Sequence, residues 1–115
     1  MIRVKLRYVH ECSFVRGEHT NFDLWQAERA RRKWPELKDG DAVALIAKQR
    51  NQIAFVYKPV TVAIREHEAR LTVSTRVRLH SRSQLNPATL ALAATNAGLE
   101  LVGFKHFEQY FANLI

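Results

Sequence analysis

Cysteine and glycine are scarce in this 115-residue chain, and each scarcity excludes a kind of site. Cys12 is the only cysteine, so no disulfide within the chain and no four-cysteine zinc site can form. Only four glycines are present and they are not clustered, which argues against a phosphate loop built from backbone N–H groups. We therefore expect no cofactor and no metal site.

Long apolar runs are also missing from the sequence. No run approaches the ~20 residues that a membrane-spanning helix needs. The N-terminus has the alternation of an amphipathic strand and not the apolar stretch of a signal peptide. The sequence therefore predicts a soluble, cytoplasmic protein, folded as a single domain over residues 1–115.

Acidic residues are few relative to basic ones. Eleven Asp and Glu face 18 Lys and Arg, which gives a formal net charge of +7 and a pI near 10.1. Residues 1–34 hold eight basic and four acidic residues, residues 35–69 hold five of each, and residues 70–115 hold five basic and two acidic. The excess of +4 and +3 at the two ends favours polyanionic partners.

Alternating and helical patterns divide the chain into short elements. Apolar Ile2, Val4, Leu6 and Tyr8 alternate with cations, which predicts a strand whose apolar parity continues through His10 and Cys12. Asn21 is a good N-cap for a helix over residues 22–33, because Pro35 prevents its extension. Apolar runs at 42–48, 52–58, 60–65 and 70–82 have the lengths and separators of β-hairpins.

The C-terminal third begins with the clearest helix signal. Asn86-Pro87 is an N-cap followed by the preferred first helical residue, and Gly98 suits a left-handed C-cap, so we expect a helix over residues 87–97. A strand over 99–104 and a last amphipathic helix follow. The order βαββββαβα predicts an α+β fold: a largely antiparallel sheet of about five to six strands, with two to three helices packed on one face.

Basic side chains gather in three places along these elements. The first strand carries Arg3, Lys5 and Arg7 on one face, the fifth carries Arg70, Arg76, Arg78, His80 and Arg82 on one face, and the helix ends in Arg29, Arg31, Arg32 and Lys33. If the two strands share a sheet, they form one cationic face that attracts phosphate backbones. The alternative interpretation is a solvated sheet face, and a helix end that only complements its own dipole.

Exposed aromatic residues are absent from these predicted strand faces, so base stacking is not expected there. The first hypothesis is a small, basic, non-catalytic domain that binds nucleic acid through phosphate contacts with weak sequence preference. The alternative is a structural or protein-interaction module that forms a homodimer. Its interface would be the apolar stripe of the last helix, namely Phe107, Tyr110, Phe111 and Leu114. We identify no catalytic residues, and an enzyme is the least supported class.

Overall fold

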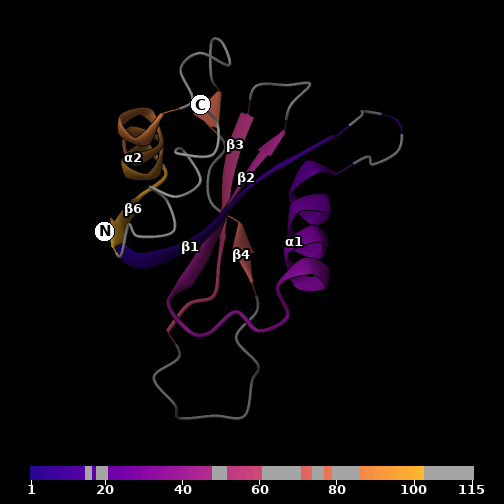
Figure 1. Ribbon diagram of the computed structural model, residues 1–115, viewed down its shortest axis with the longest axis horizontal. Helices are drawn as coiled ribbons and strands as arrows, with labels where there is room; N and C mark the ends of the chain where they lie inside the picture. The colour runs from indigo at the N-terminus through magenta and orange to yellow at the C-terminus, as the bar shows by residue number, and fades with distance from the viewer. Residues whose placement is uncertain are drawn as a thin grey trace.

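The protein is a mixed α+β structure, and in the residues that the structure describes two helices flank one sheet (Figure 1). The computed structural model describes residues 1–14, 17, 21–47, 52–60, 71–73, 77–78 and 86–102. Its elements are β1 (Ile2–Cys12), α1 (Phe22–Lys33), β2 (Asp41–Ala47), β3 (Gln52–Tyr57), β4 (Thr72–Val73), β5 (Val77–Arg78), α2 (Pro87–Asn96) and β6 (Leu99–Val102). Within these ranges no helix is long and apolar enough to cross a membrane.

The sheet is mixed, which corrects the prediction of a largely antiparallel one. The strand order is β4-β3-β2-β1-β6, and β5 also pairs with β3. β1 is parallel to both β2 and β6, whereas β2–β3, β3–β4 and β3–β5 are antiparallel. The helix between β1 and β2 causes this difference, because a crossover helix carries the chain back to the end of the sheet where it started. Only β1, β2, β3 and β6 exceed two residues among the described strands.

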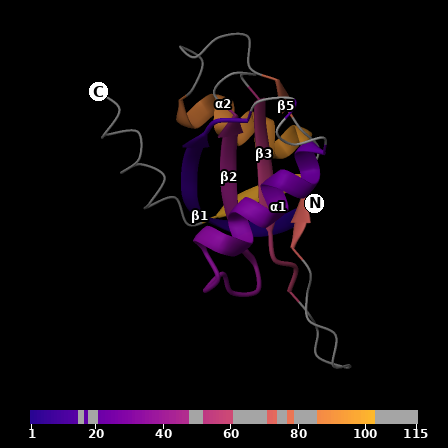
Figure 2. The ribbon, with the colours of Figure 1, turned by 90° about the vertical axis from the view of Figure 1, so that its right-hand side faces the viewer.

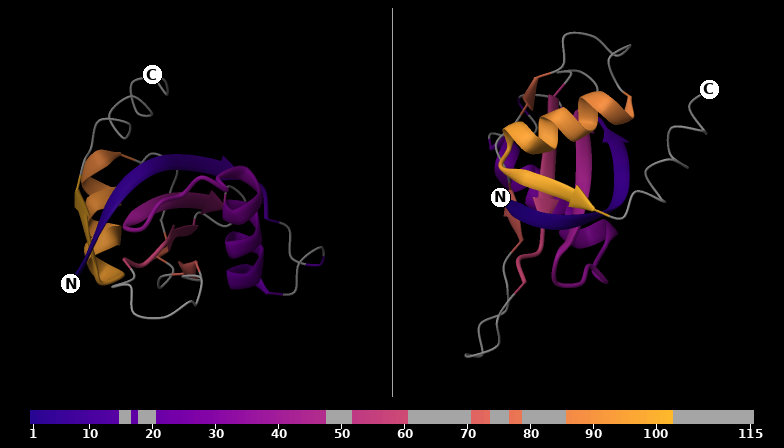
Figure 3. Two further views of the ribbon diagram at one scale, coloured as in Figure 1. Left: turned by 90° about the horizontal axis from the view of Figure 1, so that it is seen from below. Right: turned by 90° about the vertical axis from the view of Figure 1, so that its left-hand side faces the viewer.

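The helices lie on opposite faces of the sheet, and not on one face as predicted (Figures 2 and 3). Ala42, Ala44 and Ile46 of β2 share a core cluster with Leu90 and other residues of α2. The alternate residues Val43 and Leu45 pack with Ala30 of α1 and with Trp34. The sequence already carried this signal, since a strand that is apolar on both faces requires cover on both.

A β-bulge divides β1 into two halves. Side chains of the same parity face opposite sides of the sheet before and after it. Leu6 pairs with Ala42 and Tyr8 with Val43, so Arg7 is an extra residue with no counterpart in β2. Leu6 consequently faces α2, while Tyr8 packs in the cluster on the α1 side. The continuous parity expected from Ile2 to Cys12 is therefore wrong beyond Leu6, because a bulge shifts every later side chain to the other face.

The helix boundaries agree closely with their sequence signals. Asn21 Oδ1 accepts a hydrogen bond from the Leu24 N–H at 3.1 Å, and α1 ends at Lys33 as predicted. Asn86 Oδ1 accepts from the Thr89 N–H at 2.9 Å and from its hydroxyl at 3.1 Å. Gly98 has φ of +80°, the left-handed conformation that ends a helix. Both N-cap predictions and the Gly98 C-cap prediction are confirmed.

Candidate nucleic-acid interface

The cations of β1 differ in how exposed they are and in how strongly they are paired with carboxylates. Arg3 and Lys5 are exposed on the face opposite Val4 and Leu6, and the Arg3 Nε lies 3.6 Å from a carboxylate oxygen of Glu100. Such exposed pairs contribute little and exchange readily. Arg3 and Lys5 are therefore accessible to an anion.

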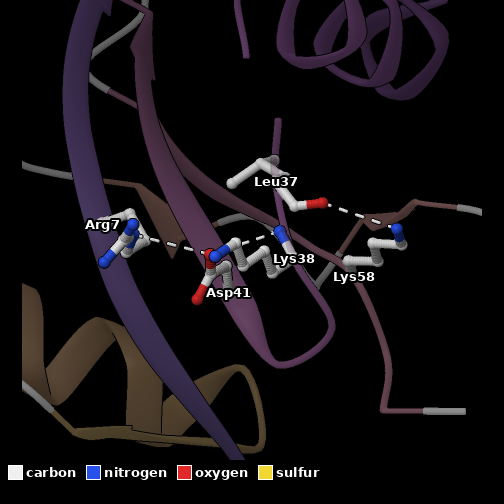
Figure 4. A network of polar contacts seen from close by, with 5 residues as sticks. All are labelled: Arg7, Leu37, Lys38, Asp41 and Lys58. Atoms are coloured by element: carbon white, nitrogen blue, oxygen red, sulfur yellow. Dashed lines mark hydrogen bonds and ion pairs between the residues drawn. The ribbon is translucent and has the colours of Figure 1, made fainter. Parts of the chain in front are cut away.

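Arg7, the bulge residue, occupies a more enclosed position. Its Nε lies 3.5 Å from the carboxylate of Asp41, which is almost fully buried at the start of β2 (Figure 4). The same carboxylate accepts a hydrogen bond from the Lys38 N–H at 3.3 Å. Because Arg7 neutralises a buried carboxylate, we assign it to the structure of the bulge and turn rather than to ligand binding.

Of the cations assigned to the fifth predicted strand, Arg78 lies within the described residues, and it is not beside the cations of β1. Arg78 lies in β5, which pairs with β3, so β3 and β2 separate it from β1. It is also at the other end of the sheet, since its partner Gln52 pairs with Ala47 at the end of β2 and Lys5 pairs with Asp41 at the start. Arg70, Arg76, His80 and Arg82 lie outside the described residues.

Among the described residues, the largest group of exposed cations lies at the basic end of α1. Arg29, Arg31, Arg32 and Lys33 are all exposed, and within the described ranges none of them forms an ion pair with a carboxylate. Asn21 and Asp23 lie at the opposite end of this helix. The cations therefore give one helix end a concentrated positive charge.

A groove of about 300 Å³ runs along this part of α1. It is lined by Trp25, Glu28, Arg29, Arg32 and Lys33, which follow one another at helical spacing on one side of the helix. Among the described residues of the lining, three cations and one carboxylate sum to a formal charge of +2. The groove is therefore suited to an anion, with Glu28 opposing it at one position.

The bulge in β1 brings His10 to the rim of this surface. The Lys33 Nζ lies 3.1 Å from Nδ1 and 3.2 Å from Nε2 of the His10 ring, and 5.5 Å from the ring centre of Trp34. Trp34 stacks on Tyr8, with the ring centres 5.4 Å apart. His10 was missed as a neighbour of Lys33, because without the bulge it would lie on the α2 face.

Trp25 and Trp34 are buried, which is usual for tryptophan in a small domain. Trp25 stacks on Phe22 and contacts Phe14 beneath the groove. The rings therefore support the helix and offer little open surface for a base.

Comparison with protein-family models, with curated proteins and with solved structures finds no match to this chain. Phe107, Tyr110, Phe111 and Leu114, the residues predicted to form a dimer interface, lie outside the described residues. The homodimer alternative stays a prediction.

Proposed function

We propose that this domain binds nucleic acid without catalysis, and that the basic end of α1 is its main contact with the phosphate backbone. The observation that supports the proposal is the group of four exposed cations on α1 without carboxylate partners in the described structure. Three of them, Arg29, Arg32 and Lys33, line the groove. The proposed main interface therefore lies on α1, one of the three groups of cations that the sequence predicts, and not on the sheet face.

The chemistry of the surface favours phosphate contacts over base recognition. Guanidinium groups bind phosphate oxygens through two parallel hydrogen bonds, which suits Arg29 and Arg32. Trp25, which lines the groove, and Trp34 are both buried and already packed against other rings. Binding would therefore be largely independent of sequence and would weaken steeply as salt displaces the released counterions.

Fluorescence anisotropy with a labelled 20-nucleotide duplex, measured over a series of salt concentrations, tests the proposal. We expect the slope of log K against log salt to fall by about one unit for each phosphate contact that is lost. The Arg29→Gln/Arg32→Gln variant should therefore lower the slope by about two units. The matched control is Arg3→Gln/Lys5→Gln, which removes the same charge from β1 and should change the slope by less than about one unit.

Two outcomes would reject the proposal. If the wild-type protein does not bind at low salt, the domain has no general affinity for nucleic acid. If both double variants lose affinity equally, net charge and not the α1 surface accounts for the binding. In the other interpretation, the cations at the end of α1 only complement the dipole of their own helix. This interpretation predicts that Arg29→Gln/Arg32→Gln lowers the melting temperature and leaves the salt slope unchanged.

A further inference from the structure

The sheet has a notch at the end where β1 and β2 begin, the end toward which α1 runs. β1 extends from Ile2, but its pairing with β2 begins only at Lys5 and Asp41. On the other side, the chain continues beyond the end of β3 through Lys58 to Val60. The first residues of β1 and the segment after β3 therefore flank a space that β2 does not fill. A cavity of about 380 Å³ lies there, with Gly40 among its lining residues.

Apolar side chains line and surround this notch. Ile2, Val4, Tyr57 and Val60 are in its wall, and Ile2 and Val60 are 49% and 67% exposed. Of the five large hydrophobic residues that are exposed in the described ranges, Ile2, Val60 and the adjoining Met1 account for three. Exposed apolar residues that gather around a cavity are typical of an interaction site, whereas single ones are ordinary.

The backbone of Arg3 is directed into the notch. The Ile2 N–H donates to the Gly98 carbonyl at 3.0 Å on the β6 side, and the Lys5 N–H donates to the Gly40 carbonyl at 2.7 Å on the β2 side. Peptide groups alternate sides along a strand, so the N–H and C=O of Arg3 face the same side as those of Lys5. β2 has no residue that could pair with the N–H and C=O of Arg3, because it begins at Asp41, opposite Lys5. Within the described structure, the notch therefore presents one unfilled position of a β-ladder.

We propose that this notch binds the C-terminal segment of a partner polypeptide, extended and apolar, as an added strand in line with β2. Strand addition supplies backbone hydrogen bonds from the protein's own ladder, and the apolar wall accepts alternate side chains. Gly40 closes the end of the notch next to β2, because its N–H donates to the Lys58 carbonyl at 2.7 Å and its carbonyl accepts from the Lys5 N–H at 2.7 Å. The inserted segment must therefore end at this point.

The charge of the notch lining determines which terminus of the partner polypeptide it accepts. Among the described residues that line the notch, Arg3 and Lys58 are cations and none is a carboxylate. Lys58 Nζ lies 3.6 Å from Asp39 in a partly exposed pair, which a ligand carboxylate can replace at small cost. A terminal carboxylate is therefore favoured over a terminal ammonium. With its carboxyl end at Gly40, the segment runs parallel to β1, as β2 does.

The probe for this proposal is a fluorescein-labelled peptide, Gly-Ser-Thr-Val-Thr-Val, with a free carboxyl terminus, measured by fluorescence anisotropy. We expect saturable binding, and a Kd raised about tenfold for Val60→Asp and about fivefold for the C-terminally amidated peptide. The matched control is Leu92→Asp, the same substitution at a residue of α2 with 61% exposure, which should leave the Kd unchanged. Arg29→Gln/Arg32→Gln should also bind the peptide normally, which separates this site from the nucleic-acid surface.

Failure to saturate at about 1 mM peptide would overturn the proposal, as would equal losses for Val60→Asp and Leu92→Asp. Thermal melts of both aspartate variants identify any loss that results from unfolding. For a variant that has lost its melting transition, Val60→Ser and Leu92→Ser provide the same comparison. Sedimentation of the unlabelled protein tests the competing occupant. A dimer that Val60→Asp dissociates would show that a second copy of this chain fills the notch.

Discussion

Leu6 and Tyr8 are two residues apart in one strand and yet face opposite sides of the sheet. Leu6 packs in the cluster that contains Leu90 of α2, and Tyr8 packs in the cluster that contains Ala30 of α1. The extra residue between them, Arg7, is the cause. This single bulge places Tyr8 and His10 beside α1, where His10 meets Lys33.

Deletion of Arg7 should therefore abolish cooperative unfolding of the protein. Without the bulge, either the residues before it or those after it would turn their apolar side chains to the wrong face. Circular dichroism during thermal denaturation measures the outcome. Arg7→Ala is the control, because it keeps the bulge and removes only the ion pair with Asp41, at a cost of about 1–3 kcal/mol. A deletion variant with a melt as sharp as that of Arg7→Ala would show that β1 tolerates either register.

Gln26 is fully buried on the sheet side of α1, and neither its Oε1 nor its Nε2 has a hydrogen-bond partner within the described structure. A buried amide without partners costs about 1–3 kcal/mol, so Gln26→Met, which keeps the side-chain length, should raise the free energy of unfolding by about 1 kcal/mol or more. Urea denaturation with an unchanged m-value measures this gain.

Gln26→Glu is the companion variant, because it keeps the size and introduces a charge that the site cannot solvate. It should lower stability by several kcal/mol. If Gln26→Met instead destabilises the protein by about 1 kcal/mol or more, the amide is hydrogen-bonded in solution, for example to an internal water.

Leu90 and Leu92 offer a matched comparison within α2. Leu90 is fully buried against the sheet, whereas Leu92 points outward. Truncation of Leu90 to Ala should cost about 2–5 kcal/mol, and truncation of Leu92 should change stability by less than about 0.5 kcal/mol. Chemical denaturation of both variants tests the placement of α2. Equal costs would mean that both faces of the helix are covered in solution.

The sequence by itself determined the features that depend on neighbouring residues. Helix α1 begins after Asn21 and ends before Trp34-Pro35, and α2 begins after Asn86, because an N-cap side chain bonds an amide only three residues away. The burial of Trp25 and Trp34 also follows from residue type. The concentration of cations at the end of α1 is likewise a property of consecutive residues.

Only the tertiary structure decided which faces and strands meet. A regular strand and a bulged one have the same local pattern from Ile2 to Cys12, and the difference becomes visible only when β1 is aligned with β2. The parallel pairing of β1 with β6 joins residues about one hundred positions apart, so no local signal specifies it. The notch at Gly40 exists because β2 starts later than its neighbours. Lys33 lies beside His10 because Arg7 forms a bulge that turns His10 toward α1. Each of these depends on register between distant segments, which side-chain packing across the whole sheet selects.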